Sequence, residues 1–264
     1  MNDEARPLAL VTGASSGIGY ELSRKFAEHG YDLVIVADHR SRLADAAASL
    51  SAMDEEPGIE AVQADLSSSE GVIRVYNAVK ALGRPIDILA ANAGVAVHGD
   101  FASETDLDAE VALINLNVTS QVHLIKLIAF EMVNRGSGDI LITSSIAGVI
   151  PGPYMAVYAA SKAFLRSFGQ AIRHELKDTG VNVTVLMPGP TDTEFFERAD
   201  MLDTLVGQSP KQNPAAVAQA AFHALRSGSD HIVPGVRNKL QAGMARLMSD
   251  KARVWMHGSQ AKRE

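Results

Sequence analysis

The chain has 264 residues, of which 47% are hydrophobic and 21% charged, and this length and composition suit one globular domain with a large core. The formal net charge of -7 at pH 7 disfavours a nucleic-acid partner. No cysteine is present and the eight histidines form no HExxH pair, so disulfides, thiolate metal sites and cysteine nucleophiles are excluded and no metal site is expected. The polar start and the lack of an apolar run approaching ~18 residues predict a cytoplasmic protein without a secretory signal or a transmembrane segment.

Short runs of branched aliphatic residues alternate with longer helical patterns. The runs are almost continuously apolar, as expected of parallel strands that helices cover on both faces. They predict strands over 8–12, 32–38, 59–65, 86–92, 138–145, 181–188 and 231–234. Helical periodicity predicts helices over 17–29, 40–52, 69–82, 107–134, 156–178 and 214–226. The alternation predicts an α/β fold with a doubly wound, mostly parallel seven-stranded sheet, in one domain over 1–264.

Two stretches fall outside this alternation. Residues 192–212 lack a strand and carry six large apolar residues: Phe195, Phe196, Met201, Leu202, Leu205 and Val206. After the last strand, apolar residues recur at helical spacing and predict an amphipathic C-terminal helix over 236–257. They are Leu240, Met244, Leu247, Met248, Val254 and Trp255. This end of the chain is basic, and such a helix packs on its own subunit or a neighbour, which we favour, or lies on a membrane surface.

A glycine-rich loop separates the first strand from the first helix. Its spacing, G-x-x-x-G-x-G over Gly13, Gly17 and Gly19, suits a tight turn before a helix whose N-terminal N–H groups bind a pyrophosphate. Glycines at this spacing also fit a simple strand-to-helix turn. However, Asp38 at the end of the second strand lies about 20 residues further on, where a carboxylate binds the adenosine ribose hydroxyls. Together the two features predict a dinucleotide site.

Asp38 also bears on the choice of cofactor. A carboxylate there repels a 2′-phosphate, and Ser15 and Ser16 leave the loop without a basic residue, so we expect NAD, with NADP as the second choice. The basic stretch 39–42 would bind a phosphate if Asp38 turned away, although it also fits a solvated first helical turn. Asp65, ending the third strand, suits the adenine edge and equally well a helix N-terminus.

A tyrosine and a lysine four residues apart form the candidate catalytic pair. Tyr158 and Lys162 share one face of the predicted helix. A phenol with a pKa near ~10 is only about 0.1% ionised at pH 7, whereas an ammonium about 4 Å away contributes about 4 kcal/mol, or roughly three pKa units. Lys162 is therefore sufficient to bring Tyr158 into the working range of a general acid/base. Such a pair is common on helices and carries no function alone.

Taken in chain order, these features resemble the short-chain dehydrogenase/reductase family, in its single-domain branch. The resemblance covers almost the whole chain and rests on TGASSGIG over 12–19, Asn92-Ala93-Gly94, Ser145, Tyr158-Ala159-Ala160-Ser161-Lys162 and Pro188-Gly189. It implies a Rossmann sheet and hydride transfer between a nicotinamide and an alcohol or carbonyl carbon.

The resemblance also implies residue roles. Tyr158 is the expected general acid/base, and Lys162 is expected to hold the nicotinamide ribose and to lower the tyrosine pKa. Ser145, with Ser144 as the second choice, is expected to hydrogen-bond the substrate oxygen.

Asn117 is expected to hold a water that relays protons from the lysine, with Asn115 as the alternative. The implied cofactor site comprises Gly13, Ser15, Ser16, Gly17, Ile18, Gly19, Asp38, Asp65, Leu66, Asn92, Ala93, Gly94, Tyr158, Lys162, Pro188, Gly189 and Thr193.

The substrate half of the site is less closely defined. We expect 192–212 to form a lid over the nicotinamide. With Val149, Ile150, Met155 and Met187 nearby, it predicts a mostly apolar pocket. A secondary alcohol or ketone of aliphatic, alicyclic or steroid-like character fits such a pocket.

Two other functions remain open. The enzymatic alternative is reduction of a 3-oxoacyl thioester. From another class, a non-catalytic dinucleotide-binding regulatory module would keep the fold without the tyrosine or lysine, and both residues are present here. The resemblance further implies a homo-oligomer, a tetramer or a dimer, assembled through the helices at 107–134 and 156–178.

Overall fold

The computed structural model describes residues 6–236, 238–240, 243, 249, 254, 257–259 and 261–262. Within this part of the chain, seven parallel strands form one sheet. The strands are β1 (Leu8–Thr12), β2 (Asp32–Ala37), β3 (Ile59–Gln63), β4 (Ile88–Ala91), β5 (Gly138–Thr143), β6 (Val181–Leu186) and β7 (His231–Ile232). Their order is β3-β2-β1-β4-β5-β6-β7, which confirms the predicted fold class.

The direction in which the sheet grows reverses between β1 and β4. From β1 the chain adds β2 and β3 on one side, then crosses to β4 and adds β5, β6 and β7 on the other. In an open parallel sheet such a reversal leaves a crevice at the carboxyl ends of the two central strands, where ligands bind. The glycine-rich loop follows β1 and Asn92 follows β4, so both predicted motifs lie at this crevice.

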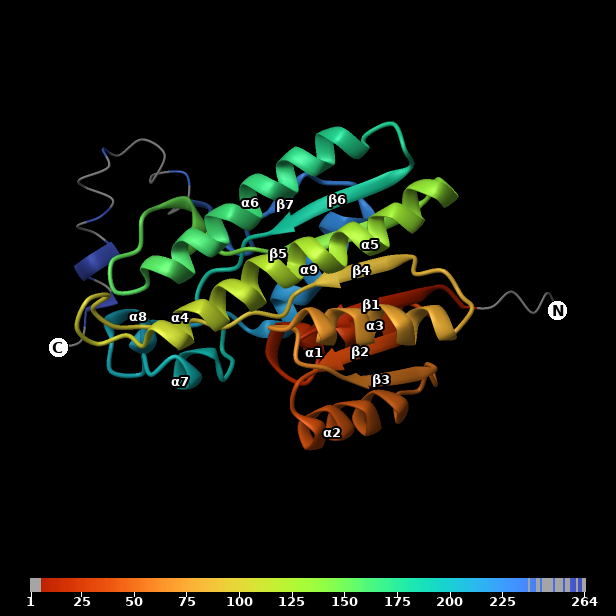
Figure 1. The fold of residues 1–264 in the computed structure, drawn as a ribbon, viewed down its shortest axis with the longest axis horizontal. Coiled ribbons are helices and arrows are strands. Elements are labelled where there is room, and N and C mark those ends of the chain that lie inside the picture. The colour runs from red at the N-terminus through yellow and green to blue at the C-terminus, as the bar shows by residue number, and fades with distance from the viewer. Residues whose placement is uncertain are drawn as a thin grey trace.

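Helices cover both faces of the sheet (Figure 1). One face carries α3 (Ser69–Ala81), α5 (Ser120–Arg135) and α6 (Ala156–Leu176). The other face carries α1 (Gly17–Glu28), α2 (Arg40–Ser51) and α9 (Pro214–Arg226). The sheet is therefore the middle of three layers, as the continuous apolar runs predicted.

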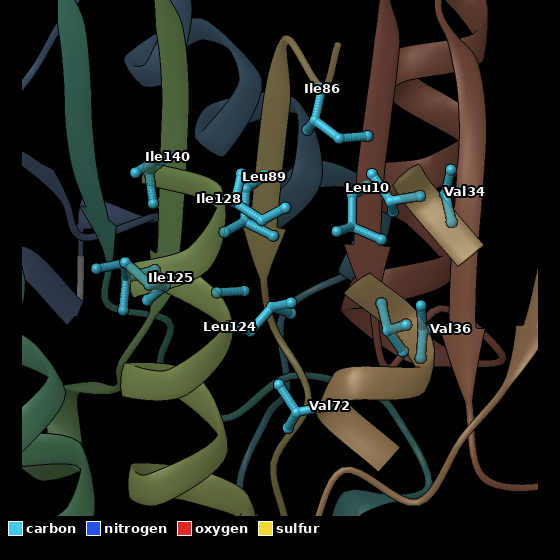
Figure 2. Close-up of a cluster of buried hydrophobic side chains, with 14 of the residues drawn as sticks. Leu10, Val34, Val36, Val72, Ile86, Leu89, Leu124, Ile125, Ile128 and Ile140 are labelled. Atoms are coloured by element: carbon cyan, nitrogen blue, oxygen red, sulfur yellow. The ribbon is translucent and has the colours of Figure 1, made fainter. Parts of the chain in front are cut away.

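Five strands, β1, β2, β4, β5 and β6, contribute to two cores at once. In β1, Leu10 packs into the core beneath α3, α5 and α6, whereas Ala9 and Val11 pack into the core on the opposite face. Figure 2 shows Leu10 and Leu89 on neighbouring strands of the first core, with Ile128 of α5 beside Leu89. Because both faces are buried, a polar residue inside a strand is costly, and polar side chains concentrate at the strand ends.

The helix predicted over 107–134 is continuous but irregular. It consists of α4 (Leu107–Ile114), a π-helical turn (Asn115–Thr119) and α5. A π turn adds a residue to the helical ladder, and such turns occur frequently at functional sites. Apolar periodicity does not reveal it, because the helix continues on both sides. The turn carries Asn117, which is fully buried.

The same run, Leu107–Arg135, is by length and composition the one helix of the described residues that could cross a membrane, with a mean hydropathy of 1.3 in its most apolar window. The sequence had predicted no segment of this kind. Its inner face belongs to the core, where Leu124, Ile125 and Ile128 pack against the sheet. A long apolar helix that packs in this way is typical of the core of this fold.

The predicted lid and C-terminal helix differ in how far the structure describes them. Within 192–212 lie α7 (Phe195–Arg198) and α8 (Leu205–Gln208), and Thr191 pairs with Gln212 where the segment begins and ends. The backbone N–H of Asp192 donates to the carbonyl oxygen of Gln212 at 2.8 Å. Of the C-terminal helix predicted over 236–257, four apolar positions fall outside the described residues: Met244, Leu247, Met248 and Trp255.

Candidate active site

A cavity of about 740 Å³ lies at the carboxyl ends of the strands. Figure 1 shows α7 and α8 at the same side of the sheet. Every residue of the predicted cofactor site lines this cavity. Among the predicted catalytic residues Ser145, Tyr158 and Lys162 also line it, whereas Asn117 lies behind the lining. The structure thus brings residues from seven separate loops and helices into one space.

The glycine-rich loop has the shape that a dinucleotide requires. Gly13 and Gly17 have φ values of +66° and +55°, which favour glycine because a side chain would be strained there. A Cβ at Gly19 would lie 2.0 Å from the carbonyl oxygen of Gly13, and one at Gly17 would lie 2.8 Å from the Thr193 methyl carbon. The loop therefore presents bare backbone at the start of α1, and these residues fit a bound pyrophosphate.

The floor of the cofactor half joins the ends of the two central strands. The Oγ1 of Thr12 accepts hydrogen bonds from the backbone N–H groups of Asn92 at 2.9 Å and Ala93 at 3.0 Å. The Nε2 of Gln121 donates to the carbonyl oxygen of Ala93 at 2.8 Å. Sequence reasoning missed Thr12 and Gln121. Thr12 is the single polar residue of the otherwise apolar first strand and stands at its end, and that is the signal that could have identified it.

Two aspartates, Asp38 and Asp65, line the end of the cavity where the adenosine is expected. Asp38 is exposed and lines the cavity directly after β2, as expected for a residue that binds ribose hydroxyls. Asp65 also lines the cavity, but its Oδ1 accepts hydrogen bonds from both the N–H and the hydroxyl of Ser67, at 2.8 and 2.7 Å. The N-cap of α3 is Ser68, whose Oγ accepts from the Gly71 N–H at 3.0 Å, so Asp65 lies in the turn before the helix and does not cap it.

Tyr158 and Lys162 lie side by side on α6, and both are buried. The Lys162 Nζ lies 5.8 Å from the centre of the tyrosine ring and donates a hydrogen bond to the carbonyl oxygen of Thr143 at 3.1 Å. Thr143 ends β5, so the strand fixes the position of the ammonium. The pair therefore faces the cavity from a rigid element.

Burial dominates the proton equilibria of this pair. It raises the pKa of Tyr158 to about 12, and a hydrogen bond with Ser145 opposes that shift. Burial also lowers the pKa of Lys162 to about 8. The sequence argument considered only the charge of the lysine, which favours the phenolate. In this structure the largest influence on the pKa of Tyr158 is the loss of water around the phenol, because desolvation penalises the ionised form, and the opposing influence is the hydrogen bond with Ser145.

Asn117 connects three elements behind the lysine. Its Nδ2 donates to the carbonyl oxygen of Val95 at 2.9 Å and to the Ser161 Oγ at 3.1 Å, and its Oδ1 accepts from the Val95 N–H at 3.0 Å. A Cβ at Gly94 would lie 3.1 Å from both the Asn117 Oδ1 and the Lys162 Nζ. Of the two candidate asparagines, Asn117 is thus the one beside the lysine. Ser161 was not predicted.

The two candidate serines occupy different environments. The Ser144 hydroxyl donates to the carbonyl oxygen of Lys162 at 2.6 Å, which ties the end of β5 to α6. The Ser145 Oγ accepts from the Ala147 N–H at 3.1 Å and lies 3.4 Å from the carbonyl oxygen of Pro188. Of the two serine hydroxyls, that of Ser145 is the one whose hydrogen bond lowers the pKa of Tyr158. Ser145 therefore stays the first choice for contact with a substrate oxygen.

The substrate half of the cavity is largely apolar. The ring of Phe195 lies 5.4 Å from that of Tyr158, centre to centre. The other apolar side chains of the lid and its surroundings that line the cavity are Val149, Ile150, Met155, Phe196, Met201, Leu205 and Val206. Met187 and Leu202 do not line the cavity: Met187 is buried against Val185 and Val233, and Leu202 is exposed.

Several polar side chains in this region escaped sequence reasoning, among them Glu194, Arg198, Lys211 and His257. The Lys211 Nζ lies 5.0 Å from the centre of the Phe196 ring and donates to the carbonyl oxygen of Gly207 at 2.5 Å. Burial lowers the pKa of His257. Single polar residues in an insert or near a chain end form no local pattern that could have identified them.

Comparison with known proteins settles the family. A family model for short chain dehydrogenases matches residues 7–201. The chain belongs to the short-chain dehydrogenase/reductase family. The resemblance inferred from the motifs is thereby confirmed, together with oxidoreductase character and a nucleotide-binding Rossmann fold.

Named relatives of this short-chain dehydrogenase/reductase extend over most of the chain. A short-chain dehydrogenase from Sphingobium yanoikuyae, solved in complex with NADPH, is 33% identical, with a TM-score of 0.80 over 92% of this chain and 95% of that one. The bulky-bulky ketone specific alcohol dehydrogenase from Comamonas testosteroni is 27% identical, with a TM-score of 0.76 over 91% and 92%. A ketoacyl reductase of Nostoc is 30% identical over 90% of this chain and 82% of its own.

Proposed function

We propose that this protein is an alcohol dehydrogenase or ketone reductase that uses NAD(H) and acts on an apolar secondary alcohol or the corresponding ketone. The observation that carries the proposal is that Tyr158, Lys162 and Ser145 line one cavity with the glycine-rich loop. A bound nicotinamide would supply the hydride acceptor or donor. The side chains of this chain supply the proton and hold the substrate.

In this proposal Ser145 and Tyr158 bind the substrate oxygen together. Tyr158 gives its proton to that oxygen when a ketone is reduced and takes the hydroxyl proton when an alcohol is oxidised. With its pKa raised to about 12, the phenol is protonated at neutral pH, which suits the reductive direction. Lys162, whose pKa is about 8, stays mostly charged at pH 7 and would hold ribose hydroxyls of the cofactor beside the phenol.

We assign NAD(H) as the first cofactor because of Asp38. Its carboxylate lines the cavity at the end of β2, where it suits a ribose with a free 2′-hydroxyl and repels a 2′-phosphate. The Sphingobium relative binds NADPH, which keeps NADP(H) as the second choice for this chain.

The apolar lining supports a bulky, apolar ketone or alcohol, and the Comamonas relative acts on bulky-bulky ketones. The second candidate is a 3-oxoacyl thioester, which the similarity to the Nostoc ketoacyl reductase favours. Non-catalytic binding of a dinucleotide is the third possibility, and it predicts binding without turnover.

The deciding experiment follows cofactor absorbance at about 340 nm with bulky ketones, secondary alcohols, steroids, diols and a 3-oxoacyl thioester, each with the NAD and the NADP forms. We expect turnover of an apolar ketone or alcohol with NAD(H). Turnover of the thioester alone would select the second candidate. Binding of cofactor with no turnover of any substrate would select the regulatory module.

We also propose that the protein is a homo-oligomer, a tetramer or a dimer. Phe130 on α5 and Phe164 on α6 are 67% and 41% exposed, which supports contact between subunits through these helices. Sedimentation of the full chain at several concentrations tests this proposal. The cytoplasmic location stays a prediction from the sequence.

A further inference from the structure

A group of three charged side chains links the lid to the adenosine end of the cavity. The Arg42 Nη1, in the first turn of α2, lies 2.9 Å from the Oε2 of Glu194, which directly precedes α7. Arg198, one helical turn after Glu194, bonds the same carboxylate oxygen. The Nη2 of Arg198 also donates to the Ser16 Oγ at 3.4 Å. We call Arg42, Glu194 and Arg198 the lid triad.

The lid triad lies beside the expected positions of the cofactor's pyrophosphate and adenosine ribose, with Glu194 and Arg198 in the cavity lining and Arg42 just outside it. Ser16, Glu194 and Arg198 line the cavity, and Asp38, four residues before Arg42, lines it too. Ser16 directly precedes the N-terminus of α1, which suits a pyrophosphate. The start of α2 is beside the ribose position that Asp38 marks. The triad therefore spans from the pyrophosphate position toward the ribose position.

The charges of the triad bear on whether the site accepts a cofactor with a 2′-phosphate. Arginine binds phosphate through two parallel N–H groups, and a nearby arginine is how this type of site accepts the 2′-phosphate of NADP. Here the guanidinium of Arg42 is already paired with a carboxylate. A 2′-phosphate would have to displace Glu194 from Arg42, and the displaced carboxylate would stay close to the phosphate and repel it.

We infer that Glu194 adds to the preference that Asp38 sets, by holding Arg42 away from a 2′-phosphate and thereby favouring NAD(H) over NADP(H). The inference rests on the proposed binding of a nicotinamide cofactor. The Arg42 and Glu194 side chains are 40% and 50% exposed. An exposed pair of this kind contributes about 1 kcal/mol at most, so Glu194 shifts the preference by about fivefold and does not abolish NADP(H) binding.

Direct titration of the full chain with NADH and NADPH, followed by fluorescence, tests this inference without turnover. In Glu194→Gln the Kd for NADPH is expected to fall about fivefold, while the Kd for NADH changes less than about twofold. Glu197→Gln is the matched control, because Glu197 is also exposed and lies three residues further along the same segment. The control removes the same charge and is expected to leave the ratio of the two Kd values unchanged.

A second variant pair assigns the effect to Arg42. When Glu194→Gln is combined with Arg42→Ala, the gain in NADPH affinity is expected to disappear. The inference is overturned if Glu197→Gln reproduces the gain, because the effect is then general charge repulsion. It is also overturned if the gain persists without Arg42. If the unmodified chain binds neither NADH nor NADPH, the proposed function fails instead, so the two failures are distinguishable.

Discussion

The two halves of the cavity are built in different ways. The cofactor half consists of backbone and small side chains at the ends of β1, β2 and β4, and its hydrogen bonds tie strand to strand, as between Thr12 and Asn92. The half proposed for the substrate is lined by side chains from residues 192–212, by Val149, Ile150 and Met155, and by His257. A change in the first half alters the frame of the fold, whereas a change in the second alters only the lining. The predictions below test whether binding and chemistry divide along this line.

The largest effect is expected from Tyr158→Phe, which removes the hydroxyl and keeps the ring. General acid/base catalysis is worth about 10²–10⁴ in rate, so kcat for a ketone should fall by about that factor. The Kd for NADH should change less than about twofold, because the ring packing is retained. Steady-state kinetics and fluorescence titration measure the two quantities. A kcat within tenfold of the unmodified value would remove Tyr158 from the chemistry.

The burial of Lys162 should make the free energy of unfolding depend on pH. Its folded pKa of about 8 lies below its ordinary value of 10.5, so the folded protein binds fewer protons than the unfolded chain between these values. Stability should therefore rise with pH across this window, by about 3 kcal/mol for complete burial of one group. Above pH ~10 the raised pKa of Tyr158 acts in the opposite direction, because the unfolded phenol ionises first.

Urea unfolding between pH 8 and 10 measures this slope. Lys162→Met keeps the side chain's length and should remove the rise with pH. An equal rise in both proteins would contradict the burial of an ionisable lysine at this position.

A smaller effect is expected from Gly17→Ala. The new methyl group would lie 2.8 Å from the Thr193 side chain at a φ of +55°, and should displace the loop that binds the pyrophosphate. Loss of one hydrogen bond to a charged group weakens cofactor binding about tenfold. Gly30→Ala is the control: φ there is +81° and nothing lies within 4 Å of the new Cβ. Both variants should lose about 1–2 kcal/mol of stability, but only Gly17→Ala should raise the Kd for NADH.

The smallest effect is expected in the substrate half. Lys211→Met removes the ammonium over the Phe196 ring, an interaction worth about 0.5–1 kcal/mol, so KM for an apolar ketone should change about two- to fivefold. The Kd for NADH should not change. Lys177→Met, at an exposed position after α6, serves as the control. A parallel change in KM and in the Kd for NADH would contradict the division of the cavity into two halves.

Features were predicted correctly from the sequence where a local pattern reflects the conformation of the backbone. Gly13 and Gly17 are needed because the chain turns through positive φ before a helix, and spacing alone reveals that need. The central strands were found because both of their faces are buried, which makes their sequences almost continuously apolar. Tyr158 and Lys162 were found together because four residues make one helical turn.

The remaining features depend on contacts that no local pattern encodes. The π-helical turn at Asn117 interrupts a helix whose apolar face continues on either side. The high pKa of Tyr158 depends on how completely the folded chain removes water from the phenol. The pair of Arg42 with Glu194 joins residues 152 positions apart. Met187 was expected near the pocket but is buried against Val185 and Val233, because the sequence after a strand does not show which face a side chain takes.

The pairing of Thr191 with Gln212 has a wider consequence. It brings the two ends of the lid together at the margin of the sheet, with the Asp192 N–H and the Gln212 carbonyl oxygen 2.8 Å apart. A segment whose ends already meet can change in length at little entropic cost to the rest of the chain. Residues 192–212 can therefore vary in length and sequence, in evolution or in design, while the strands of the sheet stay where they are.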